Sequence, residues 1–191
     1  QIVFVGVGFE TTTPLVAMAI KRARAMGLTN FTVYGAHKNM PGALEVIIND
    51  PALKLDALIL PGHVSTIIGA EPYRFLAEKY GIPGVITGFE PVDVLQGIAM
   101  LVRQLHEGRA EIEIAYARGV MPEGNPVALA AIDEVFETCT ATWRGLGDIP
   151  GSGYRIRDEF ANFDAVRRFE PDVEPTRDPK GCRCGDVLRA R

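Results

Sequence analysis

Two short stretches of the sequence combine glycine with side chains that can move protons or bind anions. They are GFETTTP, which follows an apolar run, and PGHVSTIIG, which follows another. The candidate reactive residues in these stretches are a carboxylate, an imidazole and several hydroxyl groups: Glu10, Thr11, Thr12, His63, Ser65 and Thr66. A carboxylate and an imidazole can exchange protons, and hydroxyl groups can orient a polar or anionic substrate.

Each of these residues also has a structural interpretation. A threonine such as Thr12 can cap a helix that begins at Pro14, and Glu10 can serve in a cap or a salt bridge. His63 can be an ordinary turn residue, since a single histidine is weak evidence for a site. A third polar stretch, His37-Lys38-Asn39, offers a second imidazole, and the residues alone do not decide which histidine would donate a proton.

The chain contains three cysteines, of which Cys182 and Cys184 form a CxC pair. Two thiolates at this spacing can bind a soft metal ion or part of an iron–sulfur cluster, and they can also be two surface thiols. Cys139, expected at the end of a helix, is interpreted as a half-buried structural cysteine. Three cysteines do not make a secreted disulfide framework, so we expect reduced thiols in the cytoplasm.

The elements that must position these residues alternate between strand and helix. The expected strands are residues 2–7, 31–35, 55–62, 82–88 and 110–117. The expected helices are residues 13–27, 41–50, 71–81, 90–108 and 122–137. This alternation predicts an α/β fold with open, mostly parallel, Rossmann-like sheets and helices on both faces. Because ligands bind at the carboxyl ends of parallel strands, we expect the three polar stretches along one rim.

The rest of the chain is less regular. The glycine-rich GDIPGSG stretch is interpreted as a loop, followed by weakly helical sequence, and the proline-rich segment from Glu170 is interpreted as a linker. Gly8-Phe9-Glu10 recurs as Gly88-Phe89-Glu90. The two copies could face each other across a cleft, or they could reflect a common way of turning a strand into a helix.

The bulk composition excludes several classes of function. The 191 residues are 47% hydrophobic and carry a net charge of −4, without a basic run, so nucleic acid is a poor candidate partner. No apolar run approaches the length of a membrane span, and we expect no membrane association. Gln1 begins directly at a strand and Arg191 follows the cysteine pair closely, so we interpret both ends as cuts in a longer protein.

Several motifs, taken together and in order, resemble the hydrogenase maturation protein family HypD. They are GFETTTP, PGHVSTIIG, YGIPGVITGFEPVDVLQ, PEGNP, WRGLG and CRCGDVLR. The resemblance implies two α/β lobes around a cleft and a C-terminal iron–sulfur region. On this basis we expect a first lobe at residues 1–90, a second lobe at residues 91–169 that can share elements with the first, and a linker with the start of the cluster-binding region at residues 170–191.

The resemblance also implies a function. The family provides a cytoplasmic scaffold for nickel–iron hydrogenase assembly, on which an Fe(CN)2CO unit is built with a HypC-type chaperone and with cyanide from HypE. A [4Fe-4S] cluster supplies electrons, so the protein is a redox-active scaffold rather than a classical turnover enzyme. Residues Gly8 to Thr12 and His63 to Ser65 match the family's cleft motifs, and Cys182 and Cys184 match the beginning of its cluster-binding region.

This sequence also departs from the family pattern. The N-terminal cysteine motifs and the later cluster cysteines are absent from it. We therefore expect neither the iron site nor a complete cluster in this chain alone, and we expect an open sheet edge in the first lobe. Two alternatives remain: an α/β enzyme or binding domain for a small anionic ligand at the strand rim, and a thiol-redox module at the CxC pair.

Overall fold

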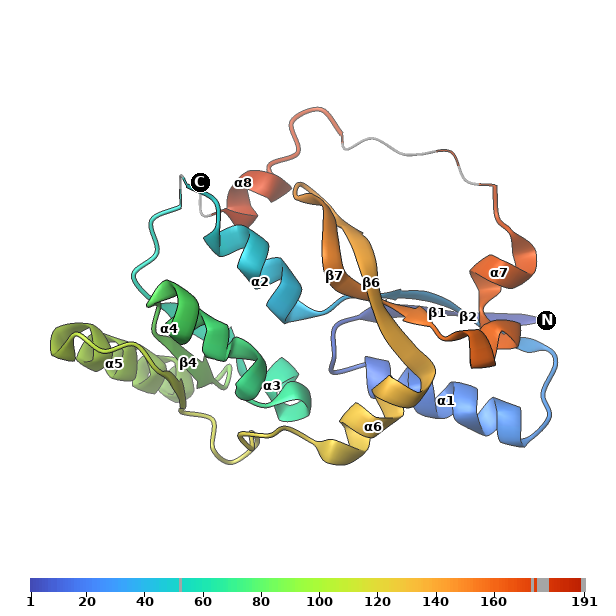
Figure 1. The fold of residues 1–191 in the computed structure, drawn as a ribbon, viewed down its shortest axis with the longest axis horizontal. Coiled ribbons are helices and arrows are strands. Elements are labelled where there is room, and N and C mark those ends of the chain that lie inside the picture. Colours follow the sequence, from blue (N-terminus) through green and yellow to red (C-terminus); the bar gives the residue numbers. More distant parts are fainter. Residues whose placement is uncertain (52, 173, 175–178, 190–191) are drawn as a thin grey trace. The chain divides into compact units, whose positions relative to one another are not determined.

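The computed structural model describes residues 1–51, 53–172, 174 and 179–189 and has an α/β fold with parallel sheets (Figure 1). The chain forms two compact units. Unit 1 contains Gln1–Leu53 and Ala130–Arg191, and unit 2 contains Lys54–Leu129. The bounds of these two units differ from the ranges expected from the sequence, which are 1–90, 91–169 and 170–191. The difference arises because the chain leaves unit 1 after Leu53 and returns to it at Ala130. Those three ranges stay a prediction for the domains of the chain.

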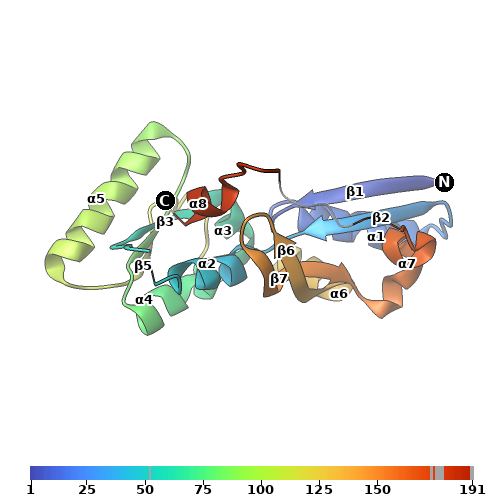
Figure 2. The ribbon, with the colours of Figure 1, turned by 90° about the horizontal axis from the view of Figure 1, so that it is seen from above.

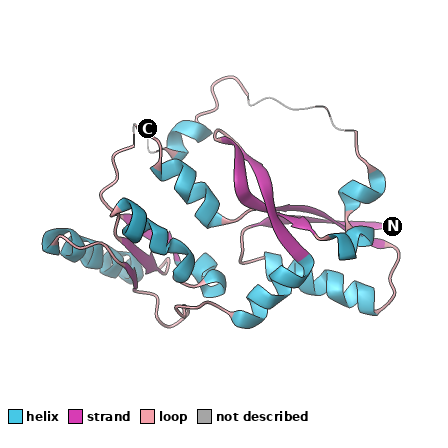
Figure 3. Ribbon diagram, viewed as in Figure 1, coloured by secondary structure: helices cyan, strands magenta, loops and turns pink. Residues whose placement is uncertain are grey.

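Unit 1 is built on a parallel pair of strands, with helices and an antiparallel hairpin beside it (Figure 3). Its elements are β1 (Ile2–Gly8), α1 (Thr13–Ala25), β2 (Phe31–His37), α2 (Met40–Ile48), β6 (Phe136–Trp143), β7 (Gly147–Ile156), η2 (Asp158–Phe163), α7 (Ala165–Phe169) and α8 (Cys184–Leu188). Helix α6 (Pro126–Val135) leads into this unit.

The sequence explains how α1 packs in unit 1. Its buried apolar residues recur at helical spacing, at Val16, Ala17, Ile20 and Ala23, and Pro14 lies in the first turn, where its missing N–H costs nothing. After the helix, Gly27 has a φ of +63°, a conformation that glycine adopts without steric cost. The predicted helix and its end are thus confirmed.

Strand β1 has an open edge among the described residues, because its sheet contains β1 and β2 alone. Its apolar side chains at five positions are exposed to solvent: Ile2, Val3, Phe4, Val5 and Val7. A hydrophobic strand with an unpaired edge is a site where other polypeptide can pair. The expected open sheet edge in this part of the chain is confirmed.

Unit 2 contains a second parallel sheet of three strands in the order β3-β4-β5. Its elements are β3 (Leu58–Pro61), α3 (Gly62–Ile68), η1 (Glu71–Tyr73), α4 (Arg74–Tyr80), β4 (Gly84–Thr87), α5 (Pro91–Glu107) and β5 (Ile112–Ile114). All four residues of the central strand β4 are buried. Figure 2 shows α5 on one side of this sheet and α4 on the other, as expected for a strand covered on both faces.

Helix α5 lies close to the sheet because of a glycine. A Cβ atom at Gly97 would collide with the Thr87 side chain on β4. On the same side of α5 the residues Asp93, Leu101 and Gln104 are buried. The side that faces the sheet is therefore partly polar.

Two predictions about the second half of the chain are wrong. The GDIPGSG stretch is not a loop, because it forms most of β7 and pairs antiparallel with β6. Cys139 lies within β6 rather than at a helix end, although it is half-buried as predicted. The hairpin is irregular between Cys139 and Ala141, where the register shifts, and this irregularity accommodates the glycines and the proline.

The expectation of a single rim is also wrong. The strands β1 and β2 belong to one sheet and β3 to another, so the first two polar stretches and PGHVSTIIG follow different sheets. The described residues include no helix with the length and apolar character needed to cross a membrane.

Candidate functional site

The first candidate site, in unit 1, begins at the turn between β1 and α1. Gly8 has a φ of +148°, and a Cβ atom there would collide with the Thr12 hydroxyl, so glycine is required. The hydroxyls of Thr12 and Thr13 donate to the Phe9 carbonyl at 3.1 and 3.0 Å. Thr12 is the residue that precedes α1, but its side chain does not cap the helix. The threonines instead tighten the turn that carries Glu10.

Glu10 does not face solvent at the rim, because its side chain is almost completely buried. Its Oε1 accepts a hydrogen bond from the Met40 N–H at 2.9 Å, at the beginning of α2. Its Oε2 is buried without a hydrogen-bond partner among the described residues. Burial away from water raises the pKa of Glu10 to about 7, so this carboxyl group is poised to gain or lose a proton near neutral pH.

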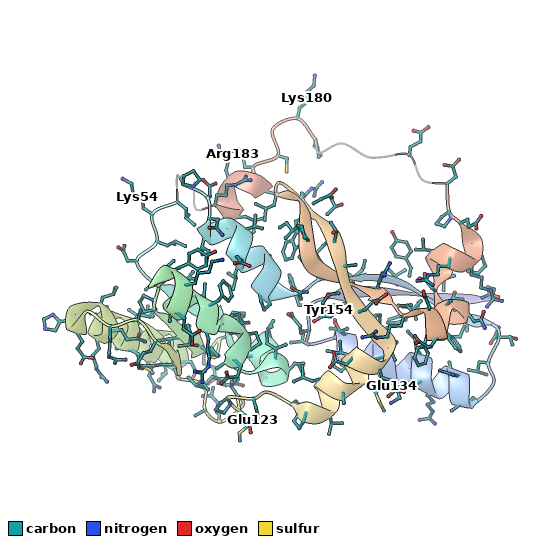
Figure 4. The ribbon with its side chains drawn as sticks, in the orientation of Figure 1. Lys54, Glu123, Glu134, Tyr154, Lys180 and Arg183 are labelled. Atoms are coloured by element: carbon teal, nitrogen blue, oxygen red, sulfur yellow. The ribbon has the colours of Figure 1, made fainter. Side chains whose placement is uncertain are left out.

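His37 is a second buried titratable group in unit 1. It ends β2 opposite Gly8 of β1, and neither of its ring nitrogens has a hydrogen-bond partner among the described residues. Burial lowers the pKa of His37, which favours the neutral imidazole. Burial and the charge of Glu10 raise the pKa of Tyr154 on β7 (Figure 4), so the Tyr154 hydroxyl stays protonated.

The hairpin fixes the beginning of α2, which in turn holds Glu10. Asn39 caps α2 by accepting from the Gly42 N–H, and its amide donates to the Gly151 carbonyl at 2.6 Å. The Asn39 N–H donates to the Ser152 carbonyl at 2.9 Å. The Ser152 hydroxyl accepts from the Trp143 indole N–H at 2.8 Å. The loop that sequence reasoning misassigned is therefore a support for this site.

An apolar pocket of about 620 Å³ joins the GFETTT turn to the cysteine motif within unit 1. It is lined by Phe9, Lys38, Trp143, Arg144, Arg183, Cys184, Val187 and Leu188. The Phe9 and Trp143 rings lie 5.9 Å apart, and the Lys38 ammonium group lies 5.5 Å from the centre of the Trp143 ring. Arg183 lies beside α8 (Figure 4). Cys184 is thus near the first motif, although the two are far apart in the sequence.

The second candidate site, in unit 2, lies at the carboxyl ends of β3, β4 and β5. Gly62 begins α3 directly after β3, and a Cβ atom there would collide with the Thr87 carbonyl oxygen of β4. His63 is exposed, and its ring lies 4.5 Å from Phe89 and 6.4 Å from Tyr116, measured between ring centres. Among the described residues no group is hydrogen-bonded to its ring nitrogens, so the imidazole is accessible from solvent.

The hydroxyls that follow His63 are used within their own helix. The buried Ser65 hydroxyl donates to the Pro61 carbonyl at 2.8 Å, and the Thr66 hydroxyl donates to the His63 carbonyl at 2.7 Å. Like those of Thr12 and Thr13, these hydroxyls retain acceptor lone pairs, but their O–H groups already donate hydrogen bonds to backbone carbonyls. This arrangement does not favour an anion held by threonine and serine O–H donors.

An arginine that no sequence motif pointed to completes the unit 2 site. Arg118 donates to both carboxylate oxygens of Asp93, at 2.8 and 2.5 Å, and to Glu90 at 2.8 Å. Its guanidinium carbon lies 4.5 Å from the centre of the Tyr116 ring. The hydrogen bonds from Arg118 lower the pKa of Asp93. A lone arginine in a short connection carries no spacing signal, which is why sequence reasoning missed it.

The predicted site residues therefore divide into two groups, each of which the structure holds together separately. Glu10, Thr11 and Thr12 belong to unit 1, and His63, Ser65 and Thr66 belong to unit 2. The repeated Gly-Phe-Glu motif has different roles in the two units, because Glu10 is buried against α2 whereas Glu90 is exposed and paired with Arg118. Both copies lie at a strand-to-helix turn, before α1 and before α5.

The described residues contain no group of three or more histidine, cysteine, aspartate or glutamate side chains arranged to hold a metal ion. Cys182 and Cys184 are half-buried and not in a disulfide. A [4Fe-4S] cluster takes four ligands, so the described residues do not complete such a site.

Comparison with known proteins assigns the chain to a family. All of residues 1–191 match the HypD family model, described as the hydrogenase formation hypA family. The chain belongs to the HypD family. It is 46% identical over 196 residues to the hydrogenase maturation factor HypD of Rhodobacter capsulatus, with 100% of this chain and 52% of that protein covered.

Other HypD relatives are similarly close. The chain is 45% identical to the hydrogenase maturation factor HypD of Cupriavidus necator, covering 99% of this chain and 52% of that protein. It is 40% identical to a putative hydrogenase expression/formation protein of Methanocaldococcus jannaschii, with 99% and 52% covered. This HypD sequence thus spans about half the length of the curated relatives that it matches, and the predicted resemblance is confirmed.

Proposed function

We propose that this chain takes part in nickel–iron hydrogenase maturation, as a scaffold on which an Fe(CN)2CO unit is assembled. The observation that carries the proposal is the match of the whole chain to the HypD family, together with relatives named as hydrogenase maturation factors. A HypC-type chaperone and HypE, as the source of cyanide, are the proposed partners, and the cytoplasm is the proposed location.

Within this function we assign different roles to the two groups of site residues. His63 is exposed with free ring nitrogens, so it is the group that exchanges a proton with the substrate or orients it. Thr11, Thr12, Ser65 and Thr66 shape the two turns. Glu10 is a positioning residue that holds the beginning of α2. Iron with cyanide and carbon monoxide ligands is the cargo.

Cys182 and Cys184 are proposed to supply part of the ligand set of a [4Fe-4S] cluster in the longer protein. Since two thiolates do not complete the set, residues outside this chain must provide the rest. Iron and labile sulfide content tests this proposal in a chimera in which this chain replaces the matching half of the Rhodobacter capsulatus relative. Cys182→Ala and Cys184→Ala should each lower both contents, and Cys139→Ala should not. Unchanged contents in both variants would remove these cysteines from the cluster.

The same chimera tests the scaffold function in a strain that lacks its own HypD. Hydrogenase activity should be restored by the chimera and lost in its His63→Ala variant. His106→Ala is the matched control, because His106 is an exposed histidine near the end of α5 in the same unit. Equal activity in the two histidine variants would remove His63 from the mechanism. A small-anion function predicts instead that phosphate raises the melting temperature of the chain.

A further inference from the structure

Tyr116, which follows β5, lies against the two turns that carry the exposed rings of the unit 2 site. A Cβ atom at Gly62 would lie 3.0 Å from the Tyr116 ring carbon Cδ1, and one at Gly88 would lie 3.0 Å from Cδ2. Gly62 immediately precedes His63, and Gly88 immediately precedes Phe89. The two edges of one tyrosine ring are thus packed against the backbone just before each exposed ring.

These contacts depend on the absence of a side chain at both glycines. On its other side, a Cβ atom at Gly62 would collide with the Thr87 carbonyl oxygen, and one at Gly88 would collide with the Asp93 carboxylate. Both glycines are buried, and close packing on two sides leaves their backbone little room to shift. The position of the Tyr116 ring therefore helps to fix where both turns lie.

Tyr116 is itself held in place. The Arg118 guanidinium carbon lies 4.5 Å from the centre of the tyrosine ring. The N–H groups of Gly119 and Val120 both donate to the Tyr116 carbonyl at 3.1 Å, so the chain turns back towards the ring. A Cβ atom at Gly119 would lie 2.7 Å from ring carbon Cε1. The ring is thus contacted on its face and along its edges.

The exposed ring pair needs such support from the backbone. The His63 and Phe89 rings lie 4.5 Å apart with their planes inclined at 50°, and Phe89 is 66% exposed. A contact between two aromatic rings contributes only about 0.5–1.5 kcal/mol. Because both rings are in contact with water, their alignment depends on the backbone segments that carry them.

We propose that Tyr116 is the positioning residue of the unit 2 site, and that its ring holds His63 and Phe89 at the distance and angle at which they meet. The proposal concerns the ring rather than the hydroxyl group, because the contacts with Gly62, Gly88 and Gly119 are made by ring carbons. The action of His63 on a substrate rests on the proposed function, whereas the geometry of the ring pair does not.

Proton–carbon NMR of the histidine rings in the full chain tests this geometry. The ring current of Phe89 shifts the His63 Cε1–H signal, which is assigned by its absence from His63→Gln, and Phe89→Leu measures the size of the shift. Spectra at about pH 9 keep ordinary imidazoles neutral. Tyr116→Leu should remove most of the shift, and Tyr116→Phe should retain it. The His106 signal, from the far end of α5, is the internal reference.

A general loss of stability is controlled for by Leu76→Ala, because Leu76 is fully buried on α4 of the same unit. Urea unfolding measures the stability of each variant. An unchanged His63 signal in a folded Tyr116→Leu chain would overturn the proposal. So would an equal change in Leu76→Ala or in Tyr116→Phe. If Tyr116→Leu does not fold, the exposed Arg118→Gln takes its place, and an unchanged His63 signal there overturns the proposal as well.

The chimera described above tests whether this positioning matters for maturation. Tyr116→Leu should lower hydrogenase activity by up to about a hundredfold, as a displacement of about 1 Å can do, and Tyr116→Phe should retain it. If His63→Ala leaves activity intact, the proposed role of His63 fails, while the NMR result still decides the positioning. If His63→Ala abolishes activity but Tyr116→Leu does not lower it, the proposal about Tyr116 is overturned alone.

Discussion

The Glu10 carboxylate accepts a hydrogen bond from the backbone N–H of Met40, although the two residues are separated by 30 positions in the sequence. This contact ties the turn after β1 to the beginning of α2, and so joins the ends of two parallel strands. Because the second carboxylate oxygen is buried and unpaired among the described residues, the contact depends on the protonation state of Glu10. Its strength should therefore vary with pH.

The pH dependence of folding stability follows from the raised pKa of Glu10. The folded protein binds this proton more tightly than the unfolded chain does, between the ordinary pKa of 4.5 and the folded value of about 7. The contribution of Glu10 to the free energy of unfolding is thus greatest below pH 4.5 and is lost as pH rises towards 7. The full effect is on the order of 3 kcal/mol, from the energy equivalent of one pKa unit.

The Glu10→Gln variant should remove this loss, since the amide oxygen can still accept from Met40 without a charge. We expect the stability of the variant, relative to the original chain, to increase between pH 4.5 and 7. Urea unfolding at several pH values measures the difference. His37 has a lowered pKa and changes stability in the opposite direction, but it is present in both proteins and cancels. Parallel pH profiles for Glu10→Gln and the original chain would contradict a raised pKa.

Gly8 should not tolerate a side chain. Its φ of +148° and its contact with Thr12 predict that Gly8→Ala destabilises unit 1 by about 1–3 kcal/mol, as expected of a strained backbone position. Gly35→Ala is the matched control, because Gly35 lies in β2 of the same sheet and a Cβ atom there would have no neighbour within 4 Å. Thermal unfolding compares the two. Equal melting temperatures would mean that the turn relaxes around the new methyl group.

The Arg118–Asp93 pair should support the unit 2 site. In the Arg118→Ala variant, the nearly buried Asp93 loses both hydrogen bonds, so its pKa should rise. The pKa of Asp93 is lowered in the folded state, so its carboxylate stabilises the fold at pH values above the ordinary pKa of aspartate. This contribution is lost as pH falls. The variant should therefore be less stable at neutral pH, with a smaller loss on acidification. Arg103→Ala, on the outer side of α5, serves as the control, and a pH profile identical to that of the control would contradict the role of the pair.

The pocket shared by Phe9 and Cys184 should be detectable by fluorescence, since Trp143 is the one tryptophan of the chain. A nitroxide label on Cys184, with Cys139 and Cys182 changed to alanine, should quench Trp143 by contact. The same label on Leu15→Cys, with all three native cysteines changed to alanine, provides a reference on the exposed side of α1. If the two labels quench equally, α8 does not lie against the GFETTT turn.

The local pattern predicted most of the α/β elements, and the places where it failed have physical causes. Strands β1 to β5 and helix α5 could be predicted because their apolar runs and their glycine and proline boundaries are local signals. The hairpin of β6 and β7 was missed because glycine and proline in β7 resemble a loop. Which strands share a sheet is determined by contacts distant in sequence, and the single rim was therefore predicted wrongly.

The candidate site residues were predictable by type but not by role. Glu10 was expected at an open rim, and only the position of α2 reveals that it is buried against Met40. His63 was singled out from the sequence and its role stays a prediction, whereas its neighbours Phe89, Tyr116 and Arg118 come together only when β4 and β5 pair. Spacing along a chain carries no information about such neighbours.

The order of the chain through the two units has a consequence for synthesis on the ribosome. Unit 2 is one continuous segment, Lys54–Leu129, whereas unit 1 needs both Gln1–Leu53 and Ala130–Arg191. Translation proceeds from the N-terminus, so unit 2 can fold while β1 and β2 still lack the hairpin that supports α2. During that interval the apolar strand β1 is at its most vulnerable to aggregation, and chaperone binding to the nascent chain should be strongest there.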